Sequence, residues 1–463
     1  MSQTLSKQAR NTVGLMMLGA FIASLTQTAL APALPSIMRD LSIDAAMAQW
    51  LTTIFMLVNG IMIPCTAYLM ARFKTRTLYL FSMSLFFVGT LMAGLAKTFF
   101  MLLVARVLQA LCFGILMPLL SGTLLMLVPP EHRGKAMGMF GLIIGVAPAI
   151  GPSLAGFVID AWGWQSFYLL LSPIVLLDIL LSFFAMGHGG ETKAIPLDFT
   201  SVVLSTVGFG GLLYGFSAAG SYGWLSAHTL VALVVGAWGT TVFMRRQKRL
   251  AVPLLRLEAF QNQNFTIGTI ISMTMMASMI FGSVLTPIYL QDIHGYSAFG
   301  AALVMLPAAM LSIILNPVAG NLFDKYGGRK IILMGGVLII LGTVGFCLFD
   351  VDSPTWFLVL AYTVRLGGTH IAITPANTWS MLEFTGESIP HANALSNTFR
   401  QIASSVGTAV FVSIYMMASA AYGGDAKTAA LFGFHVTFGV SLVMLFAVLL
   451  LGYFKIERPQ KNK

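Results

Sequence analysis

The stretch Gly145-Val-Ala-Pro148-Ala-Ile-Gly151-Pro152-Ser-Leu-Ala155-Gly156 decides the fold class, together with the earlier stretch Ala105-Arg106-Val-Leu-Gln109-Ala110. Both lie inside apolar runs of bilayer-spanning length, for which a helix needs about 20 residues. Clustered glycine and proline allow apolar helices to pack closely and to bend. An arginine in hydrocarbon is costly, so it marks a pathway or a paired functional charge. A passive anchor needs neither feature, so the two stretches are typical of a membrane transporter.

The composition excludes a soluble globular protein. Of 463 residues, 57% are hydrophobic and 9% are charged, whereas soluble proteins carry roughly 25% charged residues. The longest polar breaks, 188–197 and 245–264, are too short to fold alone, so we predict an all-α membrane protein without an extramembrane domain. The first 11 residues resemble the n-region of a signal peptide, but the apolar run 12–34 is too long for the h-region and lacks a convincing cleavage site, which predicts a retained first span.

Short polar breaks divide the chain into fourteen predicted spans. If the N-terminus is cytoplasmic, the loops place 20 basic residues on the cytoplasmic side and 3 on the outer side, with 3 more inside spans. This distribution follows the positive-inside rule and predicts that both termini are cytoplasmic, in a bacterial inner membrane. The spans are roughly 12–34, 47–70, 77–95, 99–128, 134–160, 165–187, 198–219, 226–244, 265–290, 297–322, 329–349, 355–382, 391–421 and 430–454.

The middle two spans carry almost no ionisable residues, which suggests that they link two larger units. We therefore predict a six-helix bundle over 1–190, two linking helices over 191–250 and a second six-helix bundle over 251–463. The basic cluster 245–249 is interpreted as a topogenic signal, with binding of membrane lipids as the alternative. The net charge of +10 is spread over alternate loops, so nucleic acid is not an expected partner.

No resident cofactor is expected. Cys65, Cys112 and Cys347 lie in apolar runs without CxxC spacing, so we interpret them as packed thiols and predict no disulfide and no metal site. The chain has no GxxxxGK(S/T) loop for a nucleotide. A transporter of this kind must draw its energy from a gradient, for which we expect protons, and we expect a monomer.

Two related loops point to a family. Ala67-Tyr-Leu-Met-Ala71-Arg72-Phe-Lys74 follows the second span, and Gly320-Asn-Leu-Phe-Asp324-Lys325-Tyr-Gly327-Gly328-Arg329-Lys330 follows the tenth. The second loop resembles the signature of the major facilitator superfamily, with one residue inserted. We expect Asp324 to accept hydrogen bonds from a helix N-terminus in one conformation and to lose them in another. The first copy has Ala71 in place of the aspartate, so this contact should be weak in the N-terminal half.

The resemblance extends along the chain. Arg106-x-x-Gln109 is similar to the basic motif of the family's proton antiporters, and the stretch from Gly145 to Gly156 is similar to its antiporter motif. Fourteen spans point to the drug:proton antiporter subfamily. Ala48-Gln49-Trp50-Leu51-Thr52-Thr53 and Asn397-Thr-Phe-Arg400-Gln401 resemble the lincomycin-resistance group of multidrug exporters. The resemblance implies two bundles that alternate around a midplane cavity, with the glycines and prolines of span five as a hinge and contact.

One departure from the family pattern concerns the proton. Many relatives carry an aspartate where this chain has Thr26, within Leu25-Thr26-Gln27-Thr28-Ala29. The spans contain one clearly embedded acid, Asp178, which lies nearer the cytoplasmic side than Arg106. It is the first candidate for a proton carrier, and Arg106 is nominated with it for proton coupling. A buried carboxyl can bind and release protons near neutral pH, but Asp178 can equally be a hydrogen-bonded structural group. His370 and Glu383 are further candidates, with structural histidine and solvated loop acid as the alternatives.

The family resemblance also nominates substrate contacts, because the first and fourth helices of each bundle line its cavity. Any single one of these side chains can instead serve helix packing. Arg400 is interpreted as a packing charge at an interface. The nominated residues are Gln27, Gln109, Met117, Met273, Met275, Phe281, Arg365 and Asn377.

We therefore expect a proton-driven exporter of amphipathic small molecules. The many methionine and phenylalanine side chains, 28 and 34, form adaptable apolar surfaces that suit varied ligands. An exporter dedicated to one metabolite, lipid precursor or siderophore, and a membrane sensor without transport, are the alternatives. An enzyme is not expected, because its acids and histidines would have to cluster.

Overall fold

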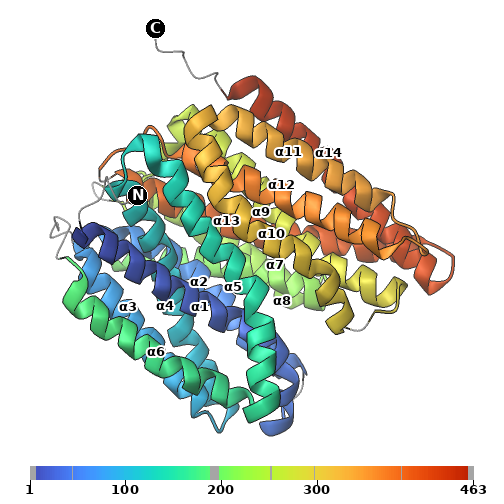
Figure 1. Cartoon of the computed structure of the whole chain (residues 1–463), viewed down its shortest axis with the longest axis horizontal. Coiled ribbons are helices and arrows are strands. Elements are labelled where there is room, and N and C mark those ends of the chain that lie inside the picture. The colour runs from blue at the N-terminus through green and yellow to red at the C-terminus, as the bar shows by residue number, and fades with distance from the viewer. Residues whose placement is uncertain are drawn as a thin grey trace.

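The computed structural model describes residues 7–43, 45–187, 198–250, 253–296, 298–386 and 388–456. Over these residues the chain forms fourteen long α-helices and three short helical turns, with no strand. Figure 1 shows the early helices (blue to teal) and the late helices (yellow to red) as two bundles. The first turn of α1 and the last turn of α14 lie at the same end of the molecule (Figure 1).

The N-terminal bundle contains six helices whose ends follow from capping groups and glycine. Thr98 accepts a hydrogen bond from Met101 N at the start of α4, and Gly163, with φ +82°, makes the tight turn between α5 and α6. The helices are α1 (Lys7–Asp40), α2 (Ala45–Arg72), α3 (Thr75–Gly94), α4 (Phe99–Leu127), α5 (Arg133–Trp162) and α6 (Trp164–Ala185), with the 3₁₀ turn η1 (Pro130–His132) before α5.

The linking helices α7 (Phe199–Tyr222) and α8 (Ala227–Gln247) form a hairpin that packs along α2 and α13. At one end Arg246 forms an ion pair with Asp198, at 2.7 Å from Nε to Oδ2. Hydrogen bonds from this guanidinium lower the pKa of Asp198 to about 2. At the other end Trp224 Nε1 donates to Ser413 Oγ of α13. The hairpin therefore contacts both bundles.

The C-terminal bundle repeats the arrangement of the first. Asn262 caps α9 by accepting from Phe265 N, and Gly327, with φ +81°, makes the turn between α10 and α11. The elements are η2 (Leu257–Gln261), α9 (Gln263–Ile288), the π-helical turn η3 (Tyr289–Ile293), α10 (Ala298–Tyr326), α11 (Gly328–Cys347), α12 (Thr355–Ser380), α13 (Ser388–Ala421) and α14 (Ala426–Lys455).

The predicted fold class is confirmed, and each predicted span corresponds to one long helix. Among the described residues, 12 helices are long and apolar enough to cross a membrane, and α2 contributes the shorter apolar stretch Trp50–Met62. The count of fourteen spans stays a prediction for α2 and α5. The predicted domain boundaries also stay predictions, because 188–197 and 251–252 lie outside the described residues.

We expect reporter fusions after Lys193 and after Arg249 to give a cytoplasmic signal, because the basic residues of these loops resist translocation. A matched fusion after Trp224, in the turn between α7 and α8, should give an outside signal. Enzymatic reporters active on only one side of the membrane make the measurement. An outside signal after Arg249 would contradict the arrangement of two linking helices.

Candidate functional site

A carboxylate of the C-terminal bundle binds the first turn of α5 in the N-terminal bundle. Asp324, near the end of α10, accepts hydrogen bonds from Gly134 N at 2.9 Å and from Lys135 N at 2.8 Å. The helices come so close that a Cβ atom added at Gly134 would lie 2.6 Å from the Gly320 carbonyl oxygen. The positive end of the α5 dipole favours this anion. We call the contact of Asp324 with Gly134 and Lys135 the latch.

Further contacts join the bundles at the same end as the latch. Arg133 donates from Nη1 to the carbonyl oxygens of Met381 (3.3 Å) and Phe384 (3.4 Å), at the end of α12. In α13, Asn393 Nδ2 donates to Ser121 Oγ of α4 at 2.8 Å. At the opposite end the lower parts of α5 and α10 separate (Figure 1). The structure therefore shows the bundles joined at the end that holds the predicted cytoplasmic loops.

Arg329, in the second signature loop, makes its contact within its own bundle. Arg329 donates from Nη2 to the Tyr453 carbonyl oxygen of α14 at 2.7 Å, which ties α11 to α14. In the first loop, Ala71 offers no side-chain acceptor for a second latch. The weaker contact expected in the N-terminal half stays a prediction.

Arg106 is buried within the N-terminal bundle and satisfied by neutral groups. Its side chain is 1% exposed. Nε donates to the Leu51 carbonyl oxygen of α2 at 3.3 Å, and Nη1 donates to Gln109 Oε1 at 3.0 Å. The guanidinium also lies 4.4 Å from the centre of the Phe55 ring, a cation–π contact. Thr26 donates to Ala23 of its own helix instead, so carbonyl, amide and ring together take the place of the missing acid.

Arg365 has a similar surrounding in the C-terminal bundle. It is 2% exposed. Nη2 donates to both the carbonyl and the hydroxyl oxygen of Ser278 at 2.8 Å, and Nε donates to Thr343 Oγ1 at 3.3 Å. Three phenylalanine rings lie within 5.5 Å of the guanidinium carbon. In this conformation Arg365 therefore stabilises the bundle core, and its contact with substrate stays a prediction.

Asp178 lies between α1, α3 and α6 rather than at the contact between the bundles. Its Oδ2 atom lies 2.6 Å from the Tyr79 hydroxyl oxygen, which also lies 2.9 Å from the Leu15 carbonyl oxygen. A phenol has one proton to donate. Both contacts are hydrogen bonds only if Asp178 is protonated and donates to Tyr79, which then donates to Leu15. This count favours a neutral carboxyl in this conformation, whose other oxygen, Oδ1, is buried without a hydrogen-bond partner among the described residues.

His370 occupies a different position, on a face of α12 directed at the other bundle. Thr374, one turn further along, donates to Asn316 Oδ1 at 3.4 Å and lies 3.1 Å from a Cβ added at Gly141 of α5. Side chains four residues apart share a helix face. His370 is 7% exposed, and its ring makes no hydrogen bond within the described part of the chain. It is therefore a buried titratable group without a partner.

Glu383 and the nominated substrate residues lie in several environments. Glu383 is exposed after α12 and accepts from the amides of Asn262 and Asn264, so it links α12 to α9. Asn377 accepts from Ser396 of α13 at 3.4 Å, and Phe281 stacks on Phe411 at 4.1 Å. The partly exposed residues of the set are Gln27, Met117 and Met273, and the buried ones are Gln109, Met275, Phe281, Arg365 and Asn377.

The glycine and proline motif lies in the middle of α5, which is one continuous helix from Arg133 to Trp162. Gly151 lies against α1, where Thr28 donates to the Ala147 carbonyl oxygen at 3.4 Å. Gly156, in contrast, has open space around it. The surroundings of Gly145, Pro148 and Pro152 are not among the described ones, so their role as a hinge stays a prediction.

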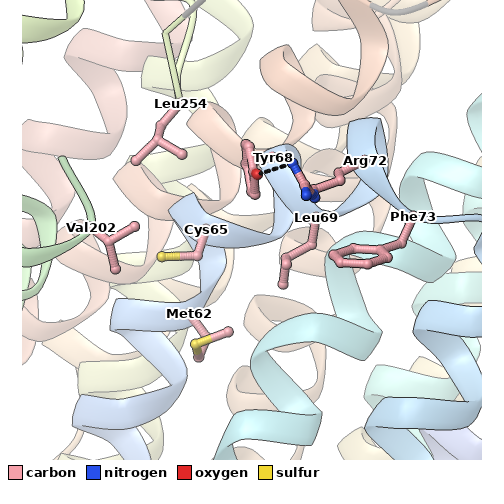
Figure 2. Close-up of a pocket in the computed structure, with 8 residues that line it drawn as sticks. All are labelled: Met62, Cys65, Tyr68, Leu69, Arg72, Phe73, Val202 and Leu254. Atoms are coloured by element: carbon pink, nitrogen blue, oxygen red, sulfur yellow. Dashed lines mark hydrogen bonds between the residues drawn. The ribbon is translucent and has the colours of Figure 1, made fainter. Parts of the chain in front are cut away.

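Sequence reasoning did not find the cavity that opens beside α2. Its volume is about 460 Å³, and it is lined by Met62, Cys65, Tyr68, Leu69, Arg72, Phe73, Val202 and Leu254. Figure 2 shows Tyr68 and Arg72 joined by a hydrogen bond, 3.3 Å long, on one side of an otherwise apolar lining. The lining comes from α2, from α7 and from the segment before α9, so no single apolar run could reveal it.

Comparison with known proteins places this architecture in a family. The family model of the Major Facilitator Superfamily matches residues 16–408. The chain belongs to the Major Facilitator Superfamily. It is 41% identical over 452 residues to the MFS-type transporter YcnB of Bacillus subtilis (strain 168), covering 97% of this chain and 95% of that protein.

Relatives named for drug resistance are also similar to this superfamily member. It is 36% identical to the lincomycin resistance protein LmrB of Bacillus subtilis (strain 168), covering 96% of this chain and 95% of that protein. This confirms the resemblance to the lincomycin-resistance group. The crystal structure of the human organic anion transporter MFSD10 (TETRAN) matches with a TM-score of 0.68 and 12% identity over 96% of this chain and 100% of that chain, which shows the same fold.

The latch predicts the effect of Asp324→Asn. The amide has one acceptor oxygen and no charge, and a hydrogen bond to a charged group contributes about 1.5–3 kcal/mol. We expect the end that carries the latch to open about tenfold more often. The measure is the alkylation rate of Asn316→Cys by an impermeant maleimide in inside-out vesicles, with alanine at the three native cysteines. Asn316 suits this because it belongs to α10 and its side chain faces α5, where its Oδ1 is 2.8 Å from a Cβ added at Gly141.

The matched control is Asp292→Asn, an exposed carboxylate in η3 away from the latch. It should leave the alkylation rate unchanged. Equal alkylation in wild type and Asp324→Asn would show that the latch does not hold the bundles together.

Gly151→Leu should abolish transport while leaving the protein inserted in the membrane. A Cβ atom at Gly151 would lie 2.1 Å from Thr28 Oγ1, so the larger side chain forces α1 and α5 apart, at a typical cost of about 1–3 kcal/mol. Gly156→Ala is the control, because nothing lies within 4 Å of its added Cβ. Transport assays normalised to membrane protein make the comparison, and normal transport by Gly151→Leu would show that close contact is not required there.

Proposed function

We propose that this superfamily member is a proton-driven exporter of amphipathic drugs or other toxic small molecules from a bacterial cell, working by alternating access. The observation that carries the proposal is the latch. It joins the bundles at one end through hydrogen bonds that a rocking motion can break and remake. Relatives named for lincomycin and multidrug resistance support this class of substrate.

The orientation of the protein in the membrane follows from the distribution of its charged residues. The end that holds the latch also holds the basic loops, so it faces the cytoplasm by the positive-inside rule. The described conformation is thus the one closed toward the cytoplasm. Export requires the reverse conformation for loading, in which Asp324 leaves the first turn of α5.

The cavity beside α2 supports entry of amphipathic molecules from the membrane. Its lining is mainly apolar, and Arg72 lies at the cytoplasmic end of α2. A ligand with an apolar body and a polar head fits such a lining. An exporter dedicated to one metabolite has no specific support among the described contacts.

For the coupling proton we propose His370. A coupling group must change its protonation as the bundles move, so it should lie where the bundles meet and have a spare hydrogen-bonding site. His370 meets both conditions. Asp178 has a spare hydrogen-bonding site at Oδ1, but it does not meet the first condition, because Tyr79 holds it inside the N-terminal bundle.

We expect His370→Gln to lose accumulation of lincomycin against its gradient in proteoliposomes with an imposed pH difference, because glutamine does not titrate. Downhill exchange of lincomycin should survive. Asp178→Asn should keep at least half of the gradient-driven transport, because the carboxamide that this substitution introduces can donate to Tyr79 as the protonated acid does.

The opposite result for the two variants would identify Asp178 as the proton carrier. In that outcome Asp178→Asn loses accumulation but keeps exchange, while His370→Gln accumulates normally. Absence of any pH-driven accumulation by the wild type, with every compound of a panel of lincosamides, dyes and fluoroquinolones, would contradict proton-driven export itself.

A further inference from the structure

Arg400 is an embedded arginine whose donors are largely unused by the protein. Arg106 and Arg365 are at most 2% exposed and surrounded by acceptors and rings. Arg400, in α13, is partly exposed. Within the described part of the chain its guanidinium has one acceptor, Asn397 Oδ1, one turn earlier on the same helix. A guanidinium has five N–H donors, so most of them remain available.

The position of Arg400 is at the contact between the bundles, not on the lipid-facing surface. Asn393 lies two turns earlier on the same face of α13 and donates to Ser121 of α4. Gln401, the next residue, has its Cγ 3.8 Å from a Cβ added at Gly60 of α2. Arg400 is thus enclosed by two contacts with the N-terminal bundle.

A second unpaired polar group lies across this contact. Asn59 precedes Gly60 in α2 and is 7% exposed. Its carboxamide makes no hydrogen bond among the described residues, and its Oδ1 lies 3.3 Å from a Cβ added at Gly114 of α4. An unpaired buried amide costs about 1–3 kcal/mol in general, so a ligand that binds it recovers a favourable interaction.

No carboxylate of the described residues pairs with Arg400. An ion pair found among the described residues, between Asp198 and Arg246, lies at the end of the linking hairpin. The first span carries the neutral Thr26 and Gln27 and no carboxylate between them. The contact between the bundles therefore presents a positive charge without a fixed counterion.

We propose that Arg400, with Asn59 across the α2–α13 contact, binds the anionic head group of an amphipathic substrate, a carboxylate or a sulfonate. This inference rests on the proposed exporter function and specifies its substrate class. The planar guanidinium matches two oxygens of such a group and forms charge-assisted hydrogen bonds with them. The apolar remainder of the substrate then lies against apolar side chains of this contact, such as Leu213, which lies with Gln401 beside Gly60.

Two fluorescent dyes with the same ring skeleton test the proposal. 8-Anilino-1-naphthalenesulfonate carries a sulfonate, and N-phenyl-1-naphthylamine does not. Saturable binding of each dye is measured by titration in nanodiscs, with empty nanodiscs subtracted. We expect Arg400→Gln to weaken binding of the sulfonate at least tenfold and binding of the neutral dye less than twofold. Arg400→Lys, which keeps the charge, should bind the sulfonate better than Arg400→Gln does.

Controls separate recognition from folding and from transport. Arg39→Gln, an exposed arginine at the end of α1, should bind both dyes as the wild type does. In the wild type, octanoate should displace the sulfonate dye at lower concentration than octanol. The proposal would be overturned if Arg400→Gln weakened binding of both dyes equally or of neither dye. It would also be overturned if the wild type showed no saturable binding of the sulfonate, or if octanoate and octanol displaced the sulfonate dye equally well. Dye binding is measured without a gradient. Failure of pH-driven transport would therefore contradict the exporter function, while the binding experiment would still test recognition of the anion by Arg400.

Discussion

The structure depends on how charged groups are accommodated where water is absent. A guanidinium in the interior of a helix bundle must find acceptors within the protein, because no counterion or solvent can reach it. Arg106 finds a carbonyl of α2, the amide of Gln109 and the ring of Phe55. Arg365 finds Ser278, Thr343 and three rings. Each arginine thereby stabilises the packing of helices within its own bundle.

Rigid bundles can move against each other only if the contacts between them can be released. The latch can be released, because it consists of two hydrogen bonds from backbone N–H groups of α5 to the single side chain of Asp324. The glycines at Gly134 and Gly320 allow the helices to come close enough for it. In the proposed alternation, release of this carboxylate has to accompany release of the Arg133 and Asn393 contacts at the same end. His370 and Arg400 lie at the contact between the bundles, where that movement changes their surroundings.

The sequence predicted much of this architecture because its strongest signals are local. Run length predicted every long helix, and the signature around Asp324 predicted an acceptor for a helix N-terminus. Partners distant in sequence could not be predicted. Asp178 attracted attention as an embedded acid, but nothing in its own segment shows that Tyr79 and Leu15 would surround it. Arg400 was interpreted as a packing charge for the same reason: its lack of acceptors becomes visible only once α2, α4 and α13 are assembled.

The central claim is that movement of a substrate outward is coupled to movement of protons inward. The direct measurement sets a lincomycin gradient against a pH gradient across proteoliposomes and finds the pair of gradients at which net lincomycin flux is zero. Coupling predicts that this balance point shifts steadily as the pH difference is changed, with one unit of pH offset by a fixed ratio of lincomycin concentrations. A balance point that stays at equal lincomycin concentrations for every pH difference would contradict the account.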